Sequence, residues 1–175
     1  MKNPMSRQPP ARPVEIFLNP GEFHFGHRDT RIRTLLGSCV AITLWHPQLL
    51  IGGMCHYLLP SAGPGSSSAE LDGRYADQAM LRFMRELARS GTRPEQYQVK
   101  LFGGGNQFPE LLQDSAGGKV PERNIEAGQR LLADYGFRLE AQHVGGTGHR
   151  TLLLELWSGH VWLRHVAGTA SGGVA

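Results

Sequence analysis

Residues 39–58 form the stretch CVAITLWHPQLLIGGMCHYL. It contains two apolar runs rich in β-forming residues, Cys39–Trp45 and Leu50–Leu58, separated by His46-Pro47-Gln48-Leu49. Proline suits the second position of a tight turn, because its ring fixes the φ angle that this position needs. The stretch therefore predicts a β-hairpin.

The sequence on either side of this hairpin predicts more strands than helices. Apolar residues at helical spacing, followed in each case by a glycine, predict helices over 75–90 and 123–135. Strands are predicted over residues 14–27 (one or two short strands), 31–36, 96–102 and 137–144, with a second hairpin whose arms are 151–157 and 160–166. Most of these strands are joined by short turns, and the βαβ alternation of a doubly wound fold is absent. We expect an α+β fold, a compact mixed and mainly antiparallel β-sheet sandwich with two flanking helices.

The chain of 175 residues has the size of one domain and enough apolar residues, 40%, to bury a core. We expect a disordered leader over residues 1–13, a single folded domain over 14–167 and a disordered tail over 168–175. A loop rich in glycine, serine and proline, residues 61–68, is expected to be mobile.

Composition and charge exclude several functions. No apolar run approaches the roughly 20 residues that span a bilayer, and no apolar stretch follows the basic N-terminal residues, so we expect neither membrane insertion nor export but a cytoplasmic protein. A net charge of +3 from scattered Lys and Arg residues does not favour nucleic-acid binding. The two cysteines are expected to be free thiols. We expect no cofactor and no metal, because His143, His149, His160 and His165 lack metal-ligand spacing.

The predicted hairpin brings a thiol and an imidazole together. If His46 and Leu49 close the turn, the numbers of opposed residues sum to 95, so that Cys39 faces His56. Directly opposed residues have Cβ atoms about 4.5–5.5 Å apart on one face of the sheet. Alternation places Cys55 on the other face, as a small buried apolar residue. A slip of one residue in the register would destroy this pairing.

This arrangement suits nucleophilic catalysis, because a free thiol is mostly protonated at neutral pH and needs a base. Gly37 and Ser38 precede Cys39, and glycine lets a backbone approach a substrate closely. Backbone N–H groups here can hold a developing oxyanion. From these residues alone, a buried structural Cys and His is as good an interpretation as a catalytic pair. Gly103-Gly104-Gly105 lacks the spacing of a phosphate loop and predicts a tight turn close to the active strand.

Several motifs, taken in their order along the chain, resemble those of the CheD family. They are Leu36-Gly37-Ser38-Cys39-Val40, His56-Tyr57-Leu58-Leu59-Pro60, Tyr75-Ala76-Asp77, Phe102-Gly103-Gly104-Gly105, Arg123-Asn124 and Gly145-Gly146 with Arg150. They extend from about Pro20 to Val166, nearly the whole folded part.

The resemblance implies a protein-glutamine glutaminase that acts on the cytoplasmic helices of bacterial chemoreceptors, with a fold similar to deamidating toxin domains. It implies Cys39 as the nucleophile that forms a thioester, His56 as its base, and a threonine as a third catalytic group. Thr34 is the candidate for that threonine, although ungapped counting in some members places Arg33 there. Gly37, Ser38, Gly103 and Gly104 would support the site. Some members also bind the phosphatase CheC, and a few are linked to methyl-ester hydrolysis.

Three departures from the family pattern concern the rim of the site. Pro121, His143 and His149 stand where the family often has glycine, an acid and glycine. Two other functional classes also stay open: a non-catalytic adaptor of the chemotaxis apparatus, and another thiol hydrolase such as an amidase, esterase or protease. A protease would ordinarily have an Asn or Asp that orients the histidine.

Overall fold

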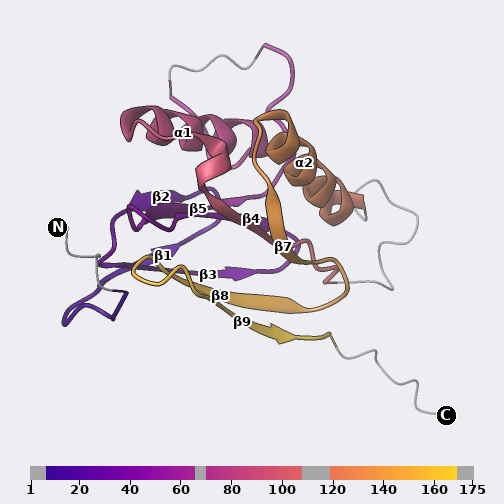
Figure 1. Ribbon diagram of the computed structural model, residues 1–175. Helices are drawn as coiled ribbons and strands as arrows, with labels where there is room; N and C mark the ends of the chain where they lie inside the picture. The colour runs from indigo at the N-terminus through magenta and orange to yellow at the C-terminus, as the bar shows by residue number, and fades with distance from the viewer. Residues whose placement is uncertain (1–6, 66–69, 108–118, 169–175) are drawn as a thin grey trace.

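The protein is built in three layers (Figure 1). The computed structural model describes residues 7–65, 70–107 and 119–168. A five-stranded sheet lies in the middle, with strand order β2(Phe23–Gly26), β5(Ile51–Tyr57), β4(Val40–His46), β6(Gln98–Gly103) and β7(Leu139–Val144). Two helices, α1(Ala76–Arg89) and α2(Val120–Asp134), cover one of its faces. A four-stranded sheet covers the other, in the order β1(Val14–Leu18), β3(Thr30–Leu36), β8(His149–Glu155) and β9(Val161–Val166).

The central strand β4 explains why the layers stack in this way. Every residue of β4 and β5 is buried, as expected of strands that are covered on both faces. Val40, Ile42 and Leu44 point into the core beneath the helices, whereas Ala41 and Trp45 point into the core between the sheets. Successive side chains of a strand point to opposite faces, so one strand serves two hydrophobic cores.

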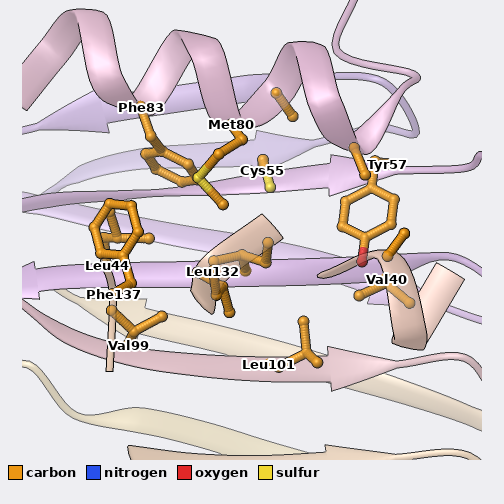
Figure 2. Close-up of a cluster of buried hydrophobic side chains, with 14 of the residues drawn as sticks. Val40, Leu44, Cys55, Tyr57, Met80, Phe83, Val99, Leu101, Leu132 and Phe137 are labelled. Carbon is orange, nitrogen blue, oxygen red and sulfur yellow. The ribbon is translucent and has the colours of Figure 1, made fainter. Parts of the chain in front are cut away.

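The core beneath the helices is the larger of the two (Figure 2). Met80 and Phe83 of α1 and Leu132 of α2 pack on the strand residues of the middle sheet. Both helices end at a glycine with positive φ, Gly91 at 63° and Gly136 at 81°. The N–H of Gly91 donates to Ala88 O and that of Thr92 to Leu87 O, which satisfies carbonyls at the end of the helix.

The expected α+β class is confirmed, and five of the seven strand pairings within the described residues are antiparallel. The structure also contains one βαβ unit, in which α2 connects the parallel neighbours β6 and β7. In addition, α2 begins at Val120, three residues before the expected start, because Pro121 is compatible with the first turn of a helix.

The hairpin exists, but its predicted register is wrong by two residues. His46 pairs with Ile51 and Ala41 with His56, so the numbers of paired residues sum to 97. The loop therefore contains four residues, Pro47–Leu50, instead of two. Leu50 adopts a left-handed φ of 52°, and its N–H donates to His46 O. Proline is a poor residue for the two-residue turns that fit hairpins, which is the physical reason for the longer loop.

Parts of three expectations lie outside the described residues. Residues 1–6 of the expected leader, 66–68 of the expected mobile loop and 169–175 of the expected tail are not described, so these expectations stay predictions. No helix of the described chain is both long enough and apolar enough to cross a membrane.

Candidate active site

Cys39 lies immediately before β4, at one end of the layer between the two sheets. It is partly buried and packs against the core between the sheets, on the same side of β4 as Ala41. His56 pairs directly with Ala41, so Cys39 is its diagonal neighbour across the strand pair. Diagonal neighbours have Cα atoms about 7–8 Å apart, within reach of long side chains. Because the register is shifted by two residues, Cys39 and His56 remain on the same face of the strand pair. They are diagonal neighbours, however, and not directly opposed as predicted.

Thr34 reaches His56 from the opposite sheet. Its Oγ1 lies 2.8 Å from His56 Nδ1 and 2.8 Å from the carbonyl oxygen of Leu18. A carbonyl oxygen can only accept, so the threonine hydroxyl donates its proton to Leu18 O. The same oxygen must then accept from His56, which places the ring proton on Nδ1 and leaves a lone pair on Nε2. Thr34 therefore fixes the tautomer in which Nε2 is the base.

Strand alternation distinguishes Thr34 from Arg33. Residues Thr30, Ile32, Thr34 and Leu36 of β3 are buried, whereas Arg33 and Leu35 are exposed on the outer face of the four-stranded sheet. Leu18, which accepts from Thr34, is its partner on the parallel neighbour β1. Arg33 thus lies on the wrong face for contact with His56.

Burial keeps both candidate catalytic groups neutral at physiological pH. Desolvation lowers the pKa of His56 to about 4, although a hydrogen bond to the Leu18 backbone and the charge of Glu22 oppose the shift. Desolvation also raises the pKa of the Cys39 thiol above its ordinary value, against the opposing effect of a hydrogen bond with Ser38. His56 Nε2 is buried and has no hydrogen-bond partner among the described residues. The structure therefore brings His56 to Thr34 but does not hydrogen-bond its Nε2 to the Cys39 thiol.

The predicted glycine turn, Gly103–Gly105, lies against Cys39. The N–H of Gly104 donates to Cys39 O at 2.8 Å, and that of Gly105 to Gly37 O at 2.9 Å. Gly103 has a φ of 112°, and a Cβ there would lie 2.2 Å from Cys39 O. A side chain at Gly103 would therefore displace the backbone that carries the thiol.

Arg150 is a candidate site residue to which the sequence reasoning gave no role. Its side chain is 1% exposed, and it lies opposite Leu36 at the end of β3. Its Nε donates to His143 Nδ1 at 2.8 Å and its Nη2 to Gly145 O at 2.6 Å. The Gly145 N–H in turn donates to Gly103 O. The buried guanidinium thus holds the Gly145 loop, and the backbone of that loop bonds to the glycine turn beside Cys39. Buried arginine is rare, but sequence alone does not show that this arginine is buried.

The backbone around His56 is held by two adjoining segments. Glu22 O accepts the His56 N–H, and the Gly21 N–H donates to His56 O. Beyond His56, the N–H groups of Leu58 and Leu59 both donate to Arg74 O.

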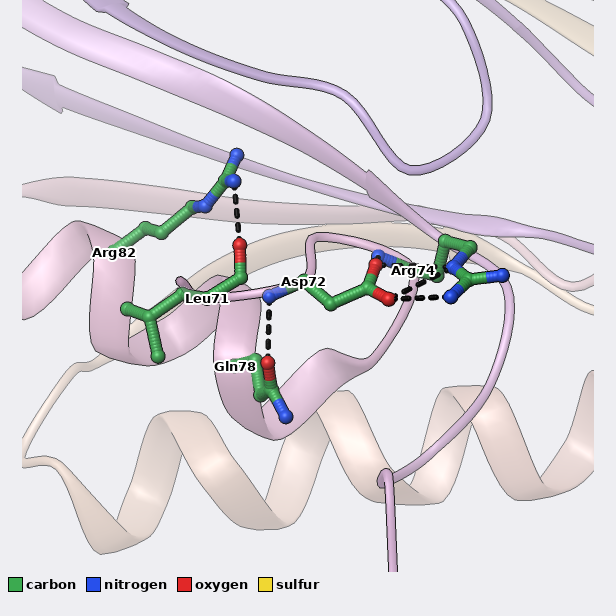
Figure 3. Close-up of polar contacts among 5 residues, drawn as sticks. All are labelled: Leu71, Asp72, Arg74, Gln78 and Arg82. Carbon is green, nitrogen blue, oxygen red and sulfur yellow. Dashed lines mark hydrogen bonds and ion pairs between the residues drawn. The ribbon is translucent and has the colours of Figure 1, made fainter. Parts of the chain in front are cut away.

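The segment that carries Arg74 is itself fixed to the start of α1 (Figure 3). Asp72 pairs with Arg74 at 2.6 Å, while its N–H donates to Gln78 Oε1, also at 2.6 Å. Arg82 Nη2 donates to Leu71 O. The backbone around His56 is therefore positioned by hydrogen bonds from the two residues before β2 and from the segment before α1.

Cys55 lies apart from this site. It points into the core beneath the helices, where burial raises the pKa of its thiol to about 12. No group of three or more His, Cys, Asp or Glu side chains that would suit a metal ion occurs within the described residues.

The fold and the site together define a class of protein, an α+β sandwich in which a cysteine starts the central strand beside a histidine and a threonine from two facing sheets. Comparisons with known proteins show the family to which the chain belongs. Residues 58–165 match the family described as CheD chemotactic sensory transduction. Over 156 residues, the chain is 51% identical to a probable chemoreceptor glutamine deamidase CheD of Pseudomonas savastanoi pv. phaseolicola, covering 89% of this chain and 87% of that protein.

More distant relatives carry the same description. A probable chemoreceptor glutamine deamidase of Dechloromonas aromatica is 50% identical over 88% of this chain and 89% of its own length. One of Leptospira interrogans is 38% identical over 88% of this chain and 94% of its own length. The chain belongs to the CheD family. A crystal structure of a Bacillus licheniformis hypothetical protein, YfiH, is similar with a TM-score of 0.46 and 12% identity, over 69% of this chain and about half, 49%, of that one.

Proposed function

We propose that this protein is a chemoreceptor glutamine deamidase that uses Cys39 as a nucleophile. Its relatives of up to 51% identity are described as probable chemoreceptor glutamine deamidases. The observation that carries the proposal is that His56 Nε2 has no hydrogen-bond partner among the described residues. Thr34 holds the ring in the tautomer in which Nε2 carries the lone pair, and Cys39 lies on the same face of the strand pair as His56. A neutral base beside a neutral thiol is ready to accept its proton when a substrate carbonyl arrives.

In the first half-reaction, the Cys39 sulfur attacks the side-chain carbonyl carbon of a receptor glutamine. The thiol proton moves to His56 Nε2 and then to the amide nitrogen, which leaves as ammonia. A thioester between Cys39 and the glutamyl side chain remains. Water, deprotonated by the same Nε2, hydrolyses the thioester to glutamate and restores the thiol. The reaction needs no cofactor.

Thr34 and the backbone near Cys39 complete the proposed mechanism. As His56 becomes protonated, the Nδ1 proton that it donates to Thr34 keeps the ring in place. The N–H groups of Ser38 and Cys39 are the candidate oxyanion donors, because among the described residues neither takes part in a backbone hydrogen bond outside the strand ladders. Gly37, Gly103 and Gly104 support this turn through the close backbone contacts described above.

Partners and location follow as part of the same proposal. The substrate is a cytoplasmic receptor helix, so the protein acts in the cytoplasm. A CheC-like phosphatase, which some members of the family bind, is the second partner in this proposal.

The test is mass spectrometry of peptides from a chemoreceptor cytoplasmic fragment incubated with the protein. We expect the mass gain of an amide-to-acid conversion at defined glutamines, and no gain with Cys39→Ala. No conversion by a folded wild-type protein acting on the receptors of its own organism would refute the deamidase and favour the adaptor. Conversion that survives Cys39→Ala would refute the thioester mechanism alone.

A further inference from the structure

A charged stripe on α2 borders a groove at the same end of the molecule as Cys39. The groove has a volume of about 190 Å³ and is lined by Pro60, Arg123, Glu126, Ala127 and Arg130. Arg123, Glu126 and Arg130 are exposed, and none of them forms an ion pair with another described residue. The stripe therefore presents two guanidinium groups and one carboxylate that are free to meet an external partner.

Contacts along α2 connect this groove to the candidate active site. Asn124, the neighbour of Arg123, is fully buried, and its Nδ2 donates to Leu58 O, two residues beyond His56. The Tyr57 hydroxyl donates to Asn124 O at 2.6 Å. From the other side, Gly104 packs against Ile125, while its N–H donates to Cys39 O. The helix that carries the stripe is thus fixed to both halves of the site.

The spacing of the stripe indicates the shape of its partner. Arg123 and Arg130 are seven residues apart, which is two helical turns, or about 10 Å along the axis. Glu126 lies between them on the same side of the helix. A second helix lying alongside α2 would match this pattern with two carboxylates seven residues apart and a cation between them.

We propose that the groove beside α2 is the docking surface for the substrate helix, and that Arg123 and Arg130 select helices with two carboxylates seven residues apart. This inference rests on the proposed function, because it assigns the choice of substrate for that same site. Arg123 and Arg130 do not touch the reacting atoms. They determine which glutamines reach Cys39 by binding the helix that carries them.

The test compares two synthetic helical peptides that each contain one glutamine. One carries glutamates seven residues apart with a lysine between them, and the other has these charges reversed. Binding to the Cys39→Ala variant is measured by fluorescence anisotropy, and deamidation by the wild type is measured as kcat and KM. We expect the acidic peptide to bind about fivefold more tightly, with a preference that weakens as salt is added.

Substitutions in the stripe complete the test. Arg123→Gln combined with Arg130→Gln should bring the binding ratio close to one and raise KM without changing kcat. Arg123→Glu with Arg130→Glu should reverse the preference. Arg85→Gln, which removes an exposed arginine of α1, should change neither quantity. A binding preference without deamidation of any substrate would reject the proposed function but keep the docking surface. Equal binding of the two peptides, or a preference that survives the double substitution, would overturn the inference.

Discussion

A single hydroxyl group determines which nitrogen of His56 can act as a base. Thr34 Oγ1 donates to Leu18 O and accepts from His56 Nδ1, so the lone pair lies on Nε2. Burial keeps the ring neutral, because desolvation lowers the pKa of His56 to about 4. At the scale of the residue, the candidate site therefore holds a neutral imidazole, with its lone pair on Nε2, on the same face as a protonated thiol.

Substitution of Thr34 tests this arrangement. In Thr34→Val the side-chain shape is nearly preserved, but the hydroxyl that accepts from Nδ1 is lost. We expect kcat for deamidation to fall by about 100-fold with little change in KM, because the wrong tautomer becomes populated. Thr34→Ser restores the hydroxyl and should recover most of kcat. Equal activity of the valine and serine variants would contradict the role given to Thr34.

At the scale of the element, the start of β4 is held by the end of β6 and the glycine turn that follows. Val40 pairs with Gly103, and the N–H groups of Gly104 and Gly105 fix the carbonyls of Cys39 and Gly37. Arg150 extends this support to the Gly145 loop, whose N–H bonds to Gly103 O. Backbone contacts of neighbouring segments therefore position Cys39, the proposed nucleophile.

Gly103→Ala tests the role of this close approach. A methyl group at Gly103 would lie 2.2 Å from Cys39 O, so the backbone at the nucleophile must move. We expect a loss of about 2 kcal/mol in the free energy of unfolding, together with a large fall in kcat. Both quantities are measured, by urea unfolding and by the deamidation assay.

Gly91→Ala is the matched control for this substitution. Gly91 also has a positive φ, 63°, but nothing lies within 4 Å of the added Cβ. It should lose about 1 kcal/mol of stability and keep its kcat. A Gly103→Ala variant with normal kcat would show that the turn does not position Cys39.

At the scale of the whole molecule, the stacked layers bury His56 to 1% exposure at the end of the core between the sheets. Folding therefore removes this imidazole from water and makes its protonation costly. Cys55, one residue earlier on β5, points into the other core and has a raised thiol pKa for the same reason. Adjacent residues on one strand thus belong to different layers with different roles.

Burial of His56 predicts a stability that depends on pH. The folded pKa of about 4 is below the unfolded value of about 6.5, so the unfolded chain binds more protons between these two values. Stability contributed by His56 is thus present above pH 6.5 and is lost as the pH falls toward 4. From pH 7 to pH 5, we expect His56 to account for a loss of about 2 kcal/mol.

The measurement is the free energy of unfolding in urea at pH 7 and pH 5, for the wild type and for His56→Gln. The lowered pKa values of His24, His46 and His143 contribute in both proteins and cancel in the comparison. The same pH dependence in both proteins would mean that His56 is not kept neutral by the fold.

The sequence by itself determined the identity and order of most elements, because periodicity, turn residues and glycine caps are local. The hairpin, both helices and the final pair of strands follow from such signals. It also placed Cys39 and His56 on one face and Cys55 on the other, since a two-residue shift in register preserves the alternation of side chains.

Only the tertiary structure decided the register of the hairpin and the partners of the site residues. The four-residue loop at Pro47–Leu50 depends on a left-handed Leu50, which no local pattern announces. Thr34 meets His56 because two separate sheets face each other, and Arg150 of β8 holds the Gly145 loop, which bonds to Gly103 more than 40 residues earlier in the chain. Such contacts depend on how the layers pack, and packing is a property of the whole chain and not of any short stretch of it.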